Sequence, residues 1–140
     1  MTENLVTILL VEDDEVDVMN VKRAFKKNNI LNPLLIARNG IEALDVLRDE
    51  ELDQPKPKII LLDLNMPKMG GIEFLKEIRK DPVLHGISVF VMTTSNEDND
   101  KVEAYNLNVA GYILKPLSME QFVEAVSTLK NYWSLCQYPD

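Results

Sequence analysis

Five short apolar runs recur along this chain, and the segments between them are long enough to form helices. The runs are near-continuous rather than alternating, which is typical of strands covered on both faces. They occupy residues 7–11, 34–37, 59–62, 87–92 and 111–114. Because strands that alternate with helices form parallel sheets through right-handed crossovers, the pattern predicts a single doubly wound α/β domain with helices on both faces of the sheet.

The intervening segments carry apolar residues at helical spacing. In the first of them, Val18, Val21 and Phe25 form one stripe. The predicted helices span residues 16–27, 41–48, 72–79, 99–107 and 119–133. Ser118 and Gln121 have the spacing of a capping box, which predicts the start of the last helix.

Length and charge limit the classes of function. The 140 residues predict one domain over residues 1–140, with a short aromatic C-terminal segment at about 131–140. The net charge of −8 argues against nucleic-acid binding, which needs basic patches. No apolar run is long enough to cross a membrane, and the N-terminus lacks the features of a secretory signal. The single cysteine, Cys136, cannot form an intrachain disulfide, so we expect a cytoplasmic location.

Carboxylate, hydroxyl or lysine side chains follow four of the five apolar runs. In doubly wound sheets, ligand sites lie beyond the carboxyl ends of the strands, at the point where the strand order reverses. We therefore expect these residues to converge on one edge of the sheet. They are Glu12, Asp13, Asp14, Asp63, Thr93, Thr94, Ser95 and Lys115.

These residue types suit phosphoryl chemistry. Carboxylates that lie close together stay charged only when a cation joins them, and oxygen ligands suit Mg²⁺. Lys115 offers a compact positive charge to a phosphate oxygen, and a threonine offers a hydroxyl donor. An Asp carboxylate can itself be the nucleophile. Asp63, directly after the run IILL, is therefore a candidate acceptor of phosphate.

A plainer interpretation stays open for each residue alone. Glu12, Asp13 and Asp14 can be the acidic first turn of a helix, stabilised by its dipole. Lys115 alone is typical of a solvated lysine, and Thr93 alone is typical of a strand end. Only their predicted convergence favours a functional site.

The segments "ILLVEDDE", "LLDLNMPKMGG", "VMTTS" and "GYILKP" resemble the receiver domain of two-component response regulators, and the resemblance covers about residues 7–129. It implies a flavodoxin-like (βα)5 fold with strand order 2-1-3-4-5. It also implies a bacterial signalling protein that catalyses only its own phosphorylation and dephosphorylation, rather than an enzyme with other substrates.

The resemblance assigns roles residue by residue. Asp63 would accept the phosphoryl group from a histidine kinase. Mg²⁺, for which Mn²⁺ or Ca²⁺ can substitute, would be held by Glu12, Asp13, Asp63 and the backbone carbonyl of Asn65. Thr93 and Lys115 would contact the phosphoryl group.

Further roles concern signalling. Thr93 and Tyr112 would form the switch, although Tyr112 can also be an ordinary strand aromatic with its hydroxyl at the surface. A cis peptide would join Lys115 to Pro116. Ser95, like Asn65, would occupy a position that tunes the lifetime of the phosphate.

No effector domain is evident after the fifth predicted helix, so we expect the output to be contact with a downstream protein. A homodimer is predicted through the face of residues 99–107, 111–114 and 119–133, or through the aromatic segment. The alternative is that the aromatic residues extend the last helix and pack on the domain. The aromatic residues are Tyr132, Trp133 and Tyr138, with the apolar Leu135 among them. The chain also resembles single-domain regulators paired with bacterial phytochrome kinases.

Two other functions remain as alternatives. The chain can be a receiver-like binding module that takes no phosphate. It can also be a phosphohydrolase with an Asp nucleophile, similar to haloacid dehalogenases. Those enzymes need a second acid two residues after the nucleophile, and Asn65 stands there instead.

Overall fold

The strands of this chain form one five-stranded parallel sheet. The computed structural model describes residues 5–51, 53, 55–115 and 118–136. The strands are β1 (Ile8–Val11), β2 (Leu34–Ala37), β3 (Ile59–Leu62), β4 (Ser88–Thr93) and β5 (Gly111–Leu114), and their order is β2-β1-β3-β4-β5. All four strand pairs are parallel. The predicted fold class is confirmed in its parallel sheet, its strand order and its alternation with five helices.

The strands are short and apolar because the central ones are buried on both sides. Every residue of β1 and β3 is buried, although neighbouring side chains on a strand point to opposite faces. This burial explains why the apolar runs are continuous rather than alternating. β4 extends one residue further than predicted, so that Thr93 is the last residue of the strand rather than the first residue after it.

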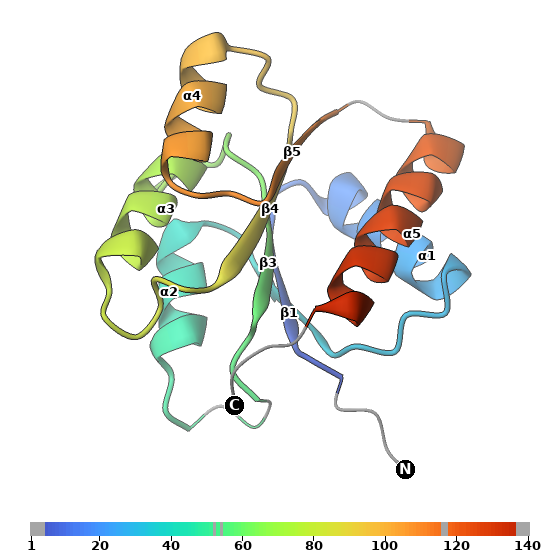
Figure 1. Ribbon diagram of the computed structural model, residues 1–140, viewed down its shortest axis with the longest axis horizontal. Helices are drawn as coiled ribbons and strands as arrows, with labels where there is room; N and C mark the ends of the chain where they lie inside the picture. Colours follow the sequence, from blue (N-terminus) through green and yellow to red (C-terminus); the bar gives the residue numbers. More distant parts are fainter. Residues whose placement is uncertain (1–4, 52, 54, 116–117, 137–140) are drawn as a thin grey trace. The chain divides into compact units, whose positions relative to one another are not determined.

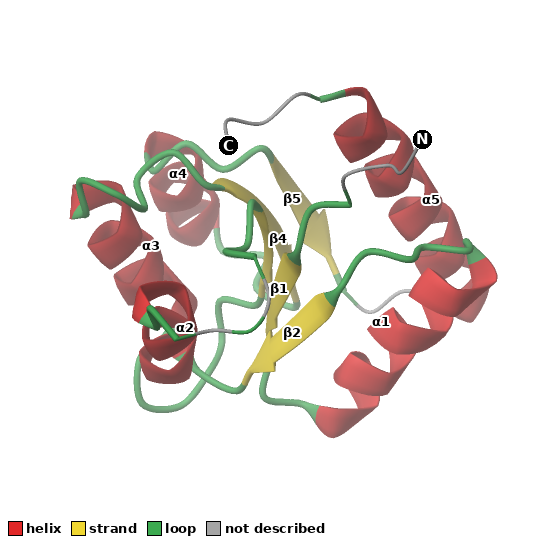
Figure 2. Cartoon of the chain, turned by 90° about the horizontal axis from the view of Figure 1, so that it is seen from below, coloured by secondary structure: helices red, strands yellow, loops and turns green. Residues whose placement is uncertain are grey.

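Three helices lie together on one side of the sheet (Figures 1 and 2). They are α2 (Gly40–Arg48), α3 (Gly71–Lys80) and α4 (Asp98–Asn106). One hydrophobic cluster joins them to alternate strand residues such as Leu9, Ile60 and Val91, with Phe74 of α3 fully buried within it. α4 contributes least to this core, because Ala104 is its only buried residue.

The remaining two helices form a second compact unit, which comprises Asp14–Leu31 and Pro116–Asp140, whereas the sheet and the other helices belong to Met1–Asp13 and Asn32–Lys115. These helices are α1 (Glu15–Lys27) and α5 (Met119–Leu135). Phe25 of α1 contacts Trp133 of α5 with ring centroids 6.0 Å apart. Lys130 donates to the carbonyl of Asn28 at 2.8 Å. The predicted capping box of Ser118 and Gln121 is present.

The position where α5 ends shows whether the aromatic segment is a tail or an extension of the last helix. The helix continues to Leu135, so residues 131–135 are helical rather than a tail. Trp133 is buried because it continues the stripe of Leu129 four residues earlier. Leu135 is 85% exposed, and Tyr132 is exposed as well. Tyr138 lies outside the described residues. None of the described helices is both long and apolar enough to span a bilayer.

Candidate functional site

Three carboxylates meet at the carboxyl edge of the sheet. Glu12 and Asp13 follow β1, and Asp63 follows β3. The two strands are in register, with Val11 beside Leu62, and the amide of Asp63 donates to the carbonyl of Val11 at 3.0 Å. This pairing continues just past the strands, and one carboxylate oxygen from each of the three residues lies within 4.8 Å of the others. The predicted convergence of these acids is therefore present.

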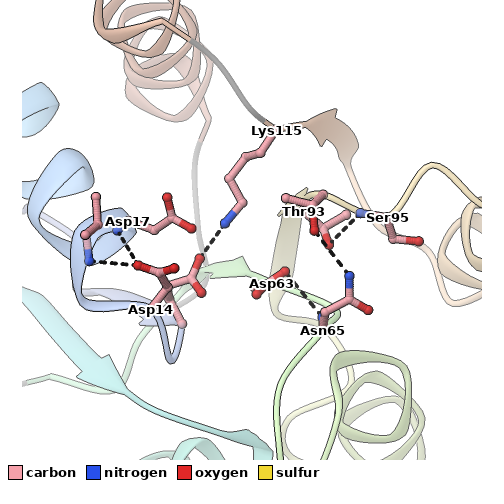
Figure 3. A network of polar contacts seen from close by, with 10 residues as sticks. Asp14, Asp17, Asp63, Asn65, Thr93, Ser95 and Lys115 are labelled. Carbon is pink, nitrogen blue, oxygen red and sulfur yellow. Dashed lines mark hydrogen bonds and ion pairs between the residues drawn. The ribbon is translucent and has the colours of Figure 1, made fainter.

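Lys115 reaches the same cluster from the end of β5. Its Nζ donates to Oε1 of Glu12 at 2.6 Å, and the two side chains are only 7% and 5% exposed. The backbone position of Lys115 is fixed by strand pairing. Its amide donates to the carbonyl of Thr93 at 2.8 Å and so continues the pairing of β5 with β4. Figure 3 shows Lys115, Asp63 and Thr93 converging from three neighbouring strands. Lys115 is thus a buried partner in an ion pair and not a solvated lysine.

The electrostatics of the cluster favour an additional positive charge. Burial raises the pKa of Glu12 to about 7; the ion pair with Lys115 opposes this effect, and the nearby Asp63 adds to it. One lysine therefore does not fully compensate the carboxylates. Because Mg²⁺ prefers a few carboxylate oxygens together with waters, the donor set of Glu12, Asp13 and Asp63 fits a hard divalent cation.

The segment after β3 holds Asp63 next to the hydroxyl residues. The amide of Asn65 donates to Oδ1 of Asp63 at 3.3 Å. The Asn65 side chain donates to the hydroxyl of Thr94 at 3.4 Å, which links the β3–α3 loop to the β4–α4 loop. Thr93 is fully buried at the end of β4, and its hydroxyl oxygen accepts from the amide of Ser95 at 3.3 Å. Figure 3 shows Thr93 and Ser95 beside this loop.

Tyr112 connects β5 to the same loop. It is half-buried, and its hydroxyl donates to the carbonyl of Ser95 at 2.9 Å. Burial raises the pKa of the phenol. The hydroxyl is therefore bonded to the β4–α4 loop rather than only to solvent, and the alternative of an ordinary strand aromatic stays open. The switch role of Tyr112 stays a prediction.

Two further predictions have other outcomes. Asp14 caps the N-terminus of α1, where its side chain accepts from the amides of Val16 and Asp17. The plainer interpretation, a charged start of a helix, thus holds for Asp14 but not for Glu12, which is buried and paired. Pro116 and the predicted cis peptide lie outside the described residues.

Sequence reasoning did not single out Asp100, although its carboxylate accepts from the hydroxyl of Ser95 at 2.5 Å. Asp100 lies in the acidic first turn of α4, together with Asp98. Acids in this turn are typical of a favourable interaction with the helix dipole, so the pattern gave no signal for a specific contact.

Comparison with known proteins identifies a family. The model of the response regulator receiver domain matches residues 8–127. The chain is 38% identical over 128 residues to the response regulator Rcp1 of Synechocystis sp., covering 90% of this chain and 87% of Rcp1. It is 40% identical over 127 residues to the probable methanogenesis regulatory protein FilR2 of Methanothrix harundinacea, covering 90% of this chain and 82% of FilR2.

The solved structures that superpose on this chain include response regulators as well. The phosphorylated cyanobacterial phytochrome response regulator RcpA superposes with a TM-score of 0.87 at 34% identity, covering 97% of this chain and 99% of RcpA. The Mn²⁺-bound form of Rcp1 superposes with a TM-score of 0.85 at 36% identity, covering 96% of this chain and 99% of that chain.

Proposed function

Because this chain belongs to the response regulator receiver family, we propose that it accepts a phosphoryl group from a histidine kinase on Asp63 and signals through altered protein contacts. The observation that carries the proposal is the shared position of three carboxylates and one buried lysine. Asp63 lies within 4.8 Å of the oxygens of Glu12 and Asp13, and Lys115 pairs with Glu12.

The proposed transfer is a displacement at phosphorus. A carboxylate oxygen of Asp63 forms the new P–O bond while the P–N bond to the kinase histidine breaks, and the leaving imidazole takes up a proton. Lys115 would pair with a phosphoryl oxygen, and the hydroxyl of Thr93 would donate to another. Both groups are buried, so the charges and dipoles that they present are weakly screened by water.

A divalent cation belongs in this proposal. The carboxylates of Glu12, Asp13 and Asp63, with the backbone carbonyl of Asn65, would hold Mg²⁺, or Mn²⁺ or Ca²⁺ in its place. When bound, the cation would neutralise negative charge on the transferring group. Mn²⁺ is the ion named for the structure of Rcp1, which supports a divalent metal here.

Thr93 and Tyr112 are the proposed switch. Thr93 lies at the end of β4 and Tyr112 lies in β5, and both bond to Ser95. A new hydrogen bond from Thr93 to the phosphoryl group would change the hydrogen bonding of the β4–α4 loop, and Tyr112 would change its position in turn. The surface that contacts the downstream protein would then include α4 and β5. The added charge of the phosphoryl group would thereby change which protein contacts this surface makes.

The proposed partners follow from the relatives. RcpA is described as a phytochrome response regulator, so a phytochrome-type histidine kinase is the proposed donor, and the downstream partner would be a protein in the cytoplasm. We also propose a homodimer. The exposed apolar residues that suit it are Val102 and Tyr105 on α4 and Leu135 on α5.

The decisive test is intact mass spectrometry after incubation with acetyl phosphate and Mg²⁺. We expect one phosphate on the native protein and none on Asp63→Asn, and none when EDTA removes the metal. Asp45→Asn is the matched control, because Asp45 is an exposed carboxylate on α2 away from the site, and it should be phosphorylated like the native protein.

Other outcomes would identify a different function. A native protein that binds Mg²⁺ but takes no phosphate from acetyl phosphate or a histidine kinase would contradict the proposal and favour a binding module. Repeated turnover of small phosphoesters would favour the phosphohydrolase alternative.

A further inference from the structure

Ser95 is held at three different atoms. Its amide donates to the hydroxyl oxygen of Thr93 at 3.3 Å, and its carbonyl accepts from the hydroxyl of Tyr112 at 2.9 Å. Its own hydroxyl donates to Oδ2 of Asp100 at 2.5 Å. Ser95 is only 8% exposed, so few water molecules can replace these partners. The position of this residue is therefore set jointly by β4, β5 and α4.

Asp100 supplies the charged contact among the three. A hydrogen bond to an ionised acceptor is shorter and stronger than one between neutral groups, and its length of 2.5 Å fits this description. Asp100 is half-buried and belongs to α4, whereas the other two partners of Ser95 belong to the sheet. Asp100 thus connects α4 to the buried part of the β4–α4 loop, whereas Lys101 of α4 donates to the exposed Asn96 of this loop at 2.6 Å.

The hydrogen bond between Ser95 and Asp100 affects the orientation of the Thr93 hydroxyl. A hydroxyl has one donor and can accept through its lone pairs. Because the oxygen of Thr93 accepts from the amide of Ser95, its hydrogen is directed elsewhere. The placement of Ser95 therefore limits the directions in which Thr93 can donate. A loop free to shift would leave this donor less well oriented.

We propose that Asp100 is a positioning residue for phosphoryl transfer, which holds Ser95 and so keeps the hydroxyl of Thr93 aimed at the phosphoryl group. The inference rests on the proposed function, because it concerns the same site. Among the described contacts, Asp100 bonds to none of the carboxylates of the cluster and not to Thr93 or Lys115, so it acts through Ser95.

Asp98 provides a matched control. It carries the same charge in the same first turn of α4, so it has a similar interaction with the helix dipole. It is exposed, and no hydrogen bond from Ser95 reaches it among the described contacts. An effect specific to Asp100 therefore cannot come from helix charge alone.

The test is the rate constant of phosphorylation by acetyl phosphate at saturating Mg²⁺, with Mg²⁺ affinity measured by calorimetry. We expect Asp100→Ala to lower the rate constant by about tenfold, since it removes a charge-assisted bond. Asp100→Asn keeps an acceptor for Ser95 and should stay within about threefold of native. Asp98→Ala should match native, and the Mg²⁺ dissociation constant should be unchanged in all three variants.

A double-mutant cycle shows whether Asp100 acts through Ser95. Ser95→Ala removes the hydroxyl that Asp100 holds, so it should slow the reaction as Asp100→Ala does. The double variant should then be no slower than either single variant. Multiplied effects in the double variant would overturn the inference, as would a native rate for Asp100→Ala or an equal loss of rate and Mg²⁺ affinity.

The two proposals fail in different ways. Phosphorylation of the native protein with an undiminished rate for Asp100→Ala would overturn the role of Asp100 and leave Asp63 as the acceptor. A native protein that takes up no phosphate would overturn both.

Discussion

Gly71 controls how closely α3 approaches the segment that follows Asp63. A Cβ atom at this position would lie 2.6 Å from the Cα of Leu64 and 2.7 Å from the carbonyl oxygen of Asp63. Both are backbone atoms, which cannot rotate away as a flexible side chain can. A glycine is therefore required by close approach, and its backbone φ is not positive.

Gly71→Ala should lower the free energy of unfolding by about 2 kcal/mol, because the loop or the helix must shift to make room. Gly86→Ala is the matched control, since a Cβ there meets nothing within 4 Å and little change is expected. Chemical denaturation of the three proteins measures both effects. Equal stability of Gly71→Ala and Gly86→Ala would contradict the close packing.

At the scale of elements, Arg79 of α3 forms hydrogen bonds both to the end of α4 and to the segment before β4. The guanidinium donates to the carbonyls of His85 and Ile87 before β4, and to those of Leu107 and Asn108 at the end of α4. The last turn of α4 has no basic residue of its own, and little of this helix is buried. A cation from α3 therefore satisfies the carbonyls at the C-terminus of α4.

Arg79→Met should destabilise the protein by about 2 kcal/mol, because four carbonyls lose a charged donor. Arg48→Met is the control. Arg48 is half-exposed and makes an ion pair of 3.2 Å with Asp81, so its loss should cost less than about 1 kcal/mol. Denaturant titration compares the two variants. A larger loss for Arg48→Met would contradict this role of Arg79.

Asp81 gives the turn after α3 a dependence on pH. The amide of Val83 is the main cause that lowers the pKa of Asp81, with further contributions from the amide of Leu84 and from Arg48. A carboxyl with a lowered folded-state pKa adds stability above its unfolded pKa, and this stability is lost as pH falls through the folded value.

We therefore expect the native protein to lose more stability than Asp81→Asn when the pH falls from neutral to below 3.8, the ordinary value for this carboxyl. Unfolding measured over this range for both proteins checks the sign. Parallel pH profiles would show that Asp81 does not carry the predicted linkage.

The elements were largely predictable from sequence, because burial on both faces produces a continuous apolar run that is hard to mistake. The polar contacts within the site were not. The bond between Ser95 and Asp100 depends on how α4 leaves the β4–α4 loop, and α4 has the weakest apolar pattern of the helices. Adjacency alone groups Asp14 with Glu12 and Asp13 in the sequence, although the structure shows that it caps α1.

At the scale of the whole molecule, the proposed homodimer is the property that sequence leaves most open. Aromatic residues indicate an interface or a buried helix stripe equally well, and α5 contains one of each kind: Trp133 is buried, whereas the neighbouring Tyr132 is 51% exposed. Tyr105, on α4, is 53% exposed and marks the second candidate surface.

We expect light scattering to find a native dimer that Leu135→Glu or Tyr105→Glu converts to a monomer, because a charge is costly to bury at an apolar interface. Val83→Glu is the control, since Val83 is equally exposed at 85% but lies in the turn after α3. Dissociation by Val83→Glu alone would place the interface elsewhere.

The site of phosphate attachment is the measurement that bears most directly on the proposed function. The protein is incubated with acetyl phosphate and Mg²⁺, treated with borohydride, which reduces an acyl phosphate to an alcohol, and digested for peptide mass spectrometry. We predict conversion of residue 63, and no other, from aspartate to homoserine. Conversion at Asp13 or Glu12, or at no residue, would contradict the assignment of Asp63 as the acceptor.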